Sequence, residues 1–304
     1  MPKRILRIFN KFIPLFFISC TIIISCKSPN EQEKEKKEYN IIADDDGILV
    51  ENFDISNTDE NKYNHNNIIY RVGNRFTYKF EHITPQGEVQ YFKIIDGGDN
   101  WNFVDIEETD STTIKTVIIE VADGNPMADH IPDYNQTVLL YRNSVQIKRY
   151  SMSGAIENEE NVWIHPPRDN YFRILEINPF PYIKAPYKIG TTWTWQLTIG
   201  EFWSDPRWKL WQGQIENNYT YKITDKNRID TALGKLTCYV IESTAKSRIG
   251  ETKLTSYFNT ELGFVRLHYT NIDGSKTNLE LTEHFKTSKL SQYSYLKMNS
   301  KKFK

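Results

Sequence analysis

Hydrophobic residues recur at every second position through much of this chain, which is the period of a strand with one face exposed. Residues 75–83 alternate aromatic with polar side chains, and residues 265–269 alternate apolar side chains with Arg and His. An Asp273-Gly274 turn then leads into a further alternating stretch around residues 279–281, which is typical of a hairpin. These segments predict antiparallel strands.

Short continuous apolar runs mark other segments. Residues 117–119 and 139–140 are apolar and bounded by polar residues, which predicts strands covered on both faces. No amphipathic helix of three turns or more stands out. The pattern therefore predicts an all-β fold.

The body of the chain contains an internal similarity. Residues 70–80 match residues 187–197, with Tyr, Gly and Thr recurring at equivalent places. Weaker matches follow in the same order: 92–96 with 221–225, 117–120 with 239–242, and 141–143 with 257–259. We therefore predict two tandem antiparallel β-repeats, residues 68–183 and 184–287, forming curved sheets or a sandwich. The Pro-rich stretch 178–186 suits a boundary, because proline removes ladder donors.

The segments flanking this body are polar. Residues 26–67 combine interspersed charges with Asn and Ser and show no persistent apolar period, which predicts a disordered tether. Within this segment we interpret 44–47, Asp-Asp-Asp-Gly, as solvated linker, because it lacks the ligand spacing of a calcium loop. Residues 288–304 are predicted to be a basic, solvated tail, and the alternative is contact with anionic envelope surfaces.

The first residues have the layout of a signal peptide. A cationic leader precedes the apolar run 12–24, and Pro14 interrupts that run. A membrane-spanning helix needs about 20 apolar residues, so the run fits a signal core better than a transmembrane span. We assign residues 1–25 to this signal peptide.

The end of the apolar run resembles the lipobox of bacterial lipoproteins. Ile23, Ile24, Ser25 and Cys26 supply two aliphatic residues, a small residue and the cysteine. In that family the thiol receives a diacylglyceryl group, the chain is cut just before the cysteine, and the new amino group is acylated. The resemblance implies cleavage before Cys26 and a membrane anchor on it, whereas Cys20 would truncate the apolar core.

The second predicted repeat resembles a pattern of uncharacterised envelope lipoproteins. The motifs are Lys188-Ile-Gly-Thr-Thr-Trp193, residues 234–241, Leu262-Gly-Phe-Val265 and Leu279-Glu-Leu281. They are similar, more weakly, to curved-sheet proteins of the lipoprotein-carrier type. This resemblance implies a curved sheet in the cell envelope and carries no catalytic residues. By analogy with lipoprotein sorting, Lys27 after the lipidated cysteine favours the outer membrane, with the side of that membrane left open.

Composition removes several function classes. The 304 residues include 38 Lys and Arg against 39 Asp and Glu, so no nucleic-acid partner is expected. Three cysteines exclude a disulfide-stapled mini-protein and a Cys-rich zinc array. Cys20 lies in the leader and Cys26 is the predicted lipidation site, so Cys238 is the one thiol expected to stay free. Its strand-like neighbours predict that this thiol is buried and inert.

Tryptophans concentrate in one stretch that the first predicted repeat lacks. The extra residues, near 200–211, carry Phe202, Trp203, Trp208 and Trp211. Broad apolar rings with one N–H donor suit stacking on sugars, acyl chains or a protein partner, so these tryptophans are the candidate partner-binding residues. The alternative is that the longer hairpin folds over the seam between the repeats and its rings fill core.

No catalytic constellation stands out. The six histidines are scattered, and no zincin motif, nucleophile elbow, P-loop or dinucleotide fingerprint is present. We therefore expect no catalytic residues, no metal site and no cofactor. The sequence favours a lipid-anchored envelope protein that binds or bridges a hydrophobic, glycan or protein partner. An envelope enzyme acting on glycans and an architectural subunit of an envelope assembly remain the alternatives.

Overall fold

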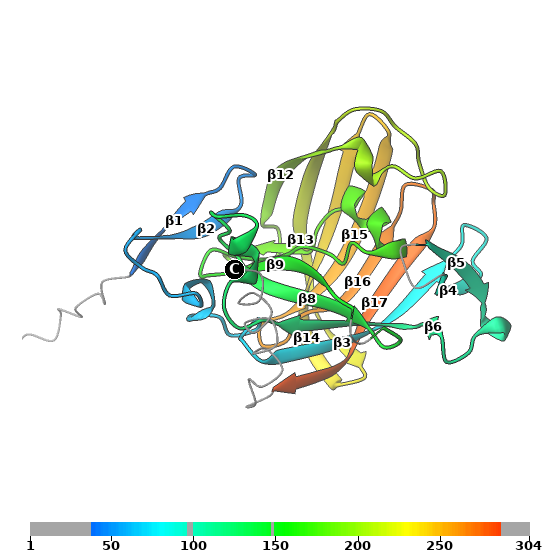
Figure 1. The fold of residues 1–304 in the computed structure, drawn as a ribbon, viewed down its shortest axis with the longest axis horizontal. Helices are drawn as coiled ribbons and strands as arrows, with labels where there is room; N and C mark the ends of the chain where they lie inside the picture. The colour runs from blue at the N-terminus through cyan, green and yellow to red at the C-terminus, as the bar shows by residue number, and fades with distance from the viewer. Residues whose placement is uncertain (1–37, 96–99, 147–148, 287–304) are drawn as a thin grey trace, which may run out of the picture. The chain divides into compact units, whose positions relative to one another are not determined.

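The computed structural model describes residues 38–95, 100–146 and 149–286 (Figure 1). The predicted signal peptide, the lipidation site Cys26 and the predicted basic tail 288–304 lie outside these ranges.

The described residues form antiparallel strands joined by turns and short 3-10 helices, which confirms the all-β prediction. The strands are β1 Tyr39–Ala43, β2 Leu49–Phe53, β3 Asn74–Ile83, β4 Val89–Ile95, β5 Asn100–Asp105, β6 Thr113–Ile114, β7 Thr116–Val121, β8 Thr137–Asn143, β9 Ser151–Glu157, β10 Asn161–Ile164, β11 Tyr182–Lys184, β12 Thr192–Ile199, β13 Ile215–Thr231, β14 Gly234–Ser247, β15 Gly250–Asn259, β16 Gly263–Thr270 and β17 Lys276–Lys286. The 3-10 helices are η1 Lys62–Asn64, η2 Ile106–Glu108, η3 Pro126–Asp129, η4 Asn170–Ile177 and η5 Glu201–Trp203.

Within the described ranges, one sheet contains fifteen of these strands. Its order is β11-β10-β9-β8-β7-β3-β17-β16-β15-β14-β13-β12, and β4 leaves this path to pair with β3, β5 and β6. Strands β12 to β17 form a continuous meander. Its last strand, β17, then pairs with β3 along most of its length, and Thr282 Oγ1 donates a hydrogen bond to the Thr77 carbonyl at 3.0 Å.

The alternating segments form strands with one buried face, as predicted. On β3, Phe76, Tyr78 and Phe80 are buried, and on β16 Leu267 and Tyr269 are buried. The turn before β17 has Gly274 at a φ of 83°, a left-handed conformation that glycine adopts at little cost. The hairpin prediction is confirmed.

The continuous apolar runs lie in strands that are covered on both faces, also as predicted. Strands β7 and β8 are buried along most of their length. One face joins the main hydrophobic core through Ile119 and Leu139. The opposite face forms a second, smaller cluster of Ala122, Met127, Val138 and Leu140.

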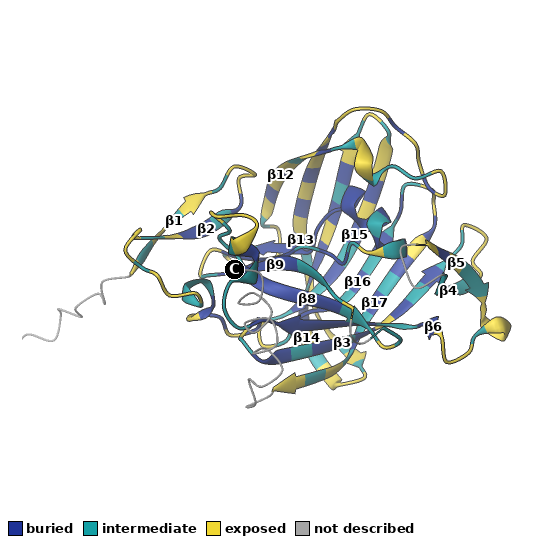
Figure 2. Ribbon diagram, in the orientation of Figure 1, coloured by how far each residue is buried: buried dark blue, intermediate teal, exposed yellow. Residues whose placement is uncertain are grey.

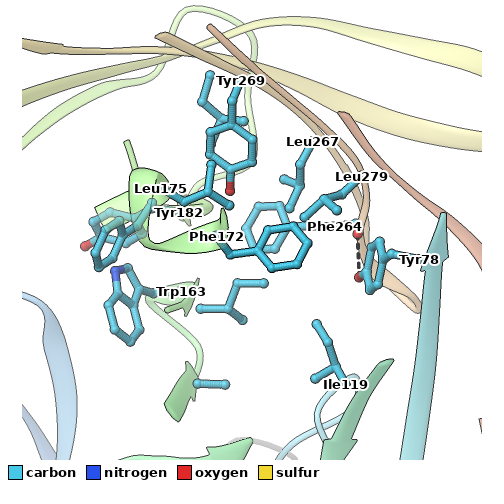
Figure 3. Close-up of a cluster of buried hydrophobic side chains, with 14 of the residues drawn as sticks. Tyr78, Ile119, Trp163, Phe172, Leu175, Tyr182, Phe264, Leu267, Tyr269 and Leu279 are labelled. Atoms are coloured by element: carbon cyan, nitrogen blue, oxygen red, sulfur yellow. Dashed lines mark hydrogen bonds between the residues drawn. The ribbon is translucent and has the colours of Figure 1, made fainter. Parts of the chain in front are cut away.

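Helix η4 supplies the centre of the main core. Figure 3 shows Phe172 and Leu175 of η4 between Trp163 and Tyr182 on one side and Leu279 and Phe264 on the other. Tyr171, also in η4, is fully buried, and its hydroxyl forms a 2.6 Å hydrogen bond with the hydroxyl of Thr277 on β17. The segment therefore packs against both halves of the sheet.

The two predicted repeats are not separate sheets. The β17–β3 ladder joins both halves into one sheet, and the main core contains side chains from both. The Pro-rich stretch 178–186 is no exposed linker, because Phe180, Tyr182 and Ile183 are buried in that core. The predicted boundary at 183/184 falls inside β11. The expectation of two sheets or a sandwich was wrong. Pairing of β17 with β3 satisfies backbone N–H and C=O groups that two separate sheets would leave unpaired at their edges.

The prediction of a disordered tether is wrong for residues 38–67. Strands β1 and β2 form a hairpin, and Asp44 Oδ1 accepts hydrogen bonds from the N–H groups of Asp46 and Ile48 in its turn. Ile48 and Val50 are buried in the main core. A few well-spaced apolar residues therefore order a segment whose composition is polar. Residues 26–37 lie outside the described ranges.

Candidate functional site

Strands β11 and β12 are the two ends of the sheet, and over the described residues no ladder pairing joins them. Aromatic rings cross this seam instead. The ring centroids of Tyr182 and Trp193 lie 5.7 Å apart, and those of Trp163 and Trp195 lie 6.2 Å apart. The sheet therefore meets itself through side chains and leaves room for a pocket.

A pocket of about 200 Å³ opens at this seam, and we call it the seam pocket. Its walls combine aromatic, aliphatic, polar and charged side chains from both ends of the sheet: Asp46, Met127, Ile131, Tyr134, Gln136, Ser153, Gly154, Trp163, His165, Arg168, Glu176, Phe180, Trp195 and Leu197. Pockets that combine apolar walls with a few convergent polar groups are the usual form of small-ligand sites.

Three rings form the apolar wall. Trp163 comes from β10, Phe180 follows η4, and Trp195 comes from β12. Their centroids lie 5.3 to 6.2 Å apart, in tilted and edge-on arrangements. The indole N–H groups of Trp163 and Trp195 are buried and have no hydrogen-bond partner.

A buried pair of titratable groups lies beside this wall. Nε2 of His165 is 3.4 Å from Oε2 of Glu176, and both side chains are almost fully buried. Nδ1 of His165 lies 2.8 Å from the Pro166 carbonyl oxygen, while Glu176 Oε2 accepts no hydrogen bond. A buried carboxylate oxygen without a donor is costly to maintain, which marks this pair as unusual.

The other buried histidine shows what a purely structural environment looks like. His82 Nδ1 lies 2.9 Å from the Tyr171 hydroxyl, which also bonds Thr277, and Asn271 donates to both hydroxyls. Burial lowers the pKa of His82 to about 4, so this ring is neutral. That network is closed, whereas the His165–Glu176 pair faces a pocket with bonding capacity unused.

The rest of the lining adds polarity around the opening. Arg168 donates to the Met152 carbonyl at 3.1 Å, and the Tyr134 hydroxyl donates to Gln136 Oε1 at 3.2 Å. A Cβ on Gly154 would lie 1.7 Å from Gln136 Oε1, so any larger residue there would force the Gln136 side chain to move. Asp46, in the turn of the β1–β2 hairpin, is exposed.

The predicted partner-binding tryptophans lie elsewhere. Trp208 and Trp211 are each 7% exposed and belong to the main core, and Trp203 packs against that core while partly buried. Arg207 covers Trp101, with its guanidinium 3.9 Å from the ring centroid. The prediction of an accessible stacking surface is wrong for Trp208 and Trp211, because the long hairpin folds back and uses its rings as core. This is the alternative that the sequence left open.

Cys238 is a free, fully buried thiol, as predicted. Burial raises its pKa to about 11, so the thiol form is the stable one.

The described ranges contain no group of three or more His, Cys, Asp or Glu side chains arranged to hold a metal ion. Of the helices in the described part of the chain, none is both long and apolar enough to cross a membrane.

Sequence reasoning missed the seam pocket. His165 and Glu176 are eleven residues apart in no recognised motif, and Trp195 was not among the candidate residues. The pocket exists because β10 and β12, which lie near opposite ends of the strand order, meet at the same seam. The usable signal was a lone Glu, Glu176, inside the mostly apolar run 174–183.

Comparison with known proteins gives structural likenesses at low identity. No protein-family model matches the chain, and no curated protein matches it. A candidate exported protein with a YmcC-like fold from Bacteroides fragilis is 10% identical over 72% of this chain and 98% of that chain, with a TM-score of 0.38. A candidate lipoprotein from Parabacteroides distasonis is 9% identical over 72% and 97%, with a TM-score of 0.39. The hypothetical lipoprotein YmcC from Escherichia coli is 10% identical over 75% and 94%, with a TM-score of 0.27.

Proposed function

We propose that this protein is a lipid-anchored protein of the bacterial cell envelope that binds a partner or ligand through its folded β-body. The observation that carries the anchor is the Ile23-Ile24-Ser25-Cys26 motif after a short apolar core. The seam pocket supports binding, because it joins aromatic walls to buried polar groups with unused bonding capacity. The partner is hydrophobic, a glycan or a protein.

The anchor is tested at Cys26. Each buried CH₂ of an acyl chain stabilises membrane binding by about 0.8 kcal/mol, so several chains on one residue hold the protein almost irreversibly. Cys26→Ala should abolish acyl labelling and partitioning into the detergent phase. Cys20→Ala is the matched control and should leave both unchanged. Unchanged partitioning of Cys26→Ala would contradict the anchor.

The membrane in question is proposed to be the outer one. Lys27, directly after the lipidated cysteine, motivates this assignment by analogy with lipoprotein sorting. Density-gradient separation of the two membranes tests it, and recovery in the inner-membrane fraction would contradict it.

Binding is tested with the full lipoprotein in detergent. A wild-type protein and a Glu176→Gln variant are compared for retention of each partner class, and the variant should lose retention of a pocket ligand. Equal retention by both would place binding outside the seam pocket.

An envelope enzyme acting on glycans is the second candidate. The seam pocket contains two carboxylates, those of Asp46 and Glu176, and glycoside hydrolysis uses such a pair. An enzyme would lose turnover of a glycan substrate in both Asp46→Asn and Glu176→Gln. A binding protein would show no turnover in wild type.

We also propose that the two halves of the sheet arose by duplication. The matched segments fall on β3 and β12, β4 and β13, β7 and β14, and β8 and β15, in the same order in each half. The halves differ at one step, because β13 lies between β12 and β14 while β3 pairs directly with β7. A relative in which the halves align along their whole length would support the proposal, and relatives with one half alone in a different fold would contradict it.

A further inference from the structure

The His165–Glu176 pair brings two hydrogen-bond acceptors together. A carbonyl oxygen only accepts, so the contact with the Pro166 carbonyl requires the hydrogen of a neutral His165 ring to sit on Nδ1. Nε2 then carries a lone pair, and it lies 3.4 Å from Oε2 of Glu176, which also only accepts when ionised. Between them a donor is missing.

Two kinds of donor can fill this position. A proton could bridge the pair, held either on Nε2, which makes the ring a cation facing the carboxylate, or on Oε2, which leaves both groups neutral. An ammonium nitrogen of a ligand could instead approach both atoms, because two acceptors 3.4 Å apart can each lie about 2.9 Å from one donor nitrogen. The two solutions exclude each other, since they use the same lone pair.

The walls of the seam pocket suit a cation. Trp163, Phe180 and Trp195 line the same pocket as the pair, and the His165 centroid lies 4.7 Å from that of Phe180 and 6.0 Å from that of Trp163. The faces of aromatic rings attract cations, most strongly where water is excluded.

The charges in the lining agree. Asp46 and Glu176 supply two negative charges and Arg168 supplies one positive charge, while Tyr134 is neutral because burial raises its pKa further. With His165 neutral, the lining carries a net charge of about −1, which one monocation would balance. Tyr219, a core residue near both carboxylates, is also neutral because burial raises its pKa.

From these observations we infer that the seam pocket binds a ligand through a single protonated amine, which sits between His165 Nε2 and Glu176 Oε2 with its apolar body against Trp163, Phe180 and Trp195. This inference rests on the proposed binding function and names its ligand class. Binding displaces any proton held on Nε2, which leaves for solvent.

Calorimetric titration of the full lipoprotein in detergent tests the inference. The probe is cyclohexylammonium, and its neutral counterpart is cyclohexanol, which has a similar size and shape. Cyclohexylammonium should bind at least about tenfold more tightly than cyclohexanol.

Variants locate the effect. Glu176→Gln should weaken cyclohexylammonium binding by about tenfold or more and leave cyclohexanol unaffected. Glu88→Gln removes an exposed carboxylate in the β3–β4 turn and should change neither. The comparison of the two probes on wild-type protein needs no variant, so a folding defect in Glu176→Gln would not decide the outcome.

Contrary results are distinct. Equal or tighter binding of cyclohexanol would overturn the amine assignment and leave the proposed function standing. If neither probe binds, the amine assignment is likewise overturned. Failure of the proposed function would appear separately, as unchanged membrane partitioning of Cys26→Ala.

Discussion

Strands β12 to β17 and strands β7 to β10 belong to one sheet but bury their side chains in different ways. In the C-terminal meander, buried residues alternate with exposed or half-buried ones, and Figure 2 shows this as bands along β13, β15 and β16. Strands β8 and β9 are buried over most of their length in the same view. One half of the sheet has a solvated face, and the other is covered on both faces.

The difference follows from what covers the sheet. The β1–β2 hairpin, η1 and η3 are irregular elements that the meander lacks, and they come from the N-terminal half. Irregular backbone needs side-chain partners, so polar groups such as Glu157 and Asn161 are buried there. The seam pocket takes most of its lining from the same half. We therefore expect the functional site in the part of the N-terminal half where apolar and polar residues do not alternate regularly along the sequence.

The largest effect is expected at Tyr171, whose hydroxyl contacts His82 of one half and Thr277 of the other. Tyr171→Ala should lower the free energy of unfolding by about 4 kcal/mol, because a fully buried ring is lost. Urea unfolding followed by circular dichroism should show one shifted transition. Tyr171→Phe keeps the ring but not the bonds to Thr277 and His82, and should cost about 1 to 2 kcal/mol. A separate, unshifted transition for the meander would show that the halves fold independently.

The long hairpin after β12 offers the next largest effect. Trp211→Ala should cost about 3 kcal/mol, because the ring fills the main core. Phe202→Ala, at a ring 70% exposed in the same hairpin, should stay within about 0.5 kcal/mol. Thermal melts of both variants measure this. A small shift for Trp211→Ala would restore the binding interpretation of these tryptophans.

The buried carboxylate of Glu157, in the N-terminal half, is expected to make the stability of the protein depend on pH. Glu157 accepts hydrogen bonds from the N–H groups of Ile68, Ile69 and Tyr70, and Glu157→Ala should cost about 2 kcal/mol. Burial outweighs these bonds and raises the pKa of Glu157. Its protonated form is therefore favoured by folding, so this contribution to stability is present below about pH 4.5 and is lost as pH rises through the folded-state pKa.

The measurement is chemical unfolding at a series of pH values. Wild-type protein should lose stability relative to Glu157→Gln as pH rises from about 4 to 7, because the amide does not titrate. Parallel curves for the two proteins would contradict the assignment.

The smallest effect is expected inside the meander. Cys238→Ala should cost about 1 kcal/mol, because one sulfur atom leaves a small cavity. The thiol has a pKa of about 11 and no exposed surface, so iodoacetamide should modify it only after unfolding. Rapid labelling of the folded protein would show that β14 opens readily.

Prediction from sequence succeeded where the chain repeats a simple period. The strands around Phe76 and Leu267 were found because alternation alone specifies a half-buried strand. The β1–β2 hairpin was missed, because its few apolar residues, including Ile48 and Val50, become significant only once the core that they join is known.

The seam pocket could not be predicted for a related reason. Trp163 and Trp195 meet only because the two ends of the sheet face each other, and no local pattern encodes that distance. The burial of Glu176 could not be predicted either, since it depends on how η4 packs.

The pairing of β17 with β3 also constrains how the molecule is made. The partners of β3 in this ladder, such as Glu283 for Thr77, are about two hundred positions further along the chain. During synthesis, β3 must wait with one edge unsatisfied until the final strand emerges. Contacts of such sequence separation make folding slow and leave nascent chains prone to aggregation, so we expect this protein to depend on chaperones until its last strand is complete.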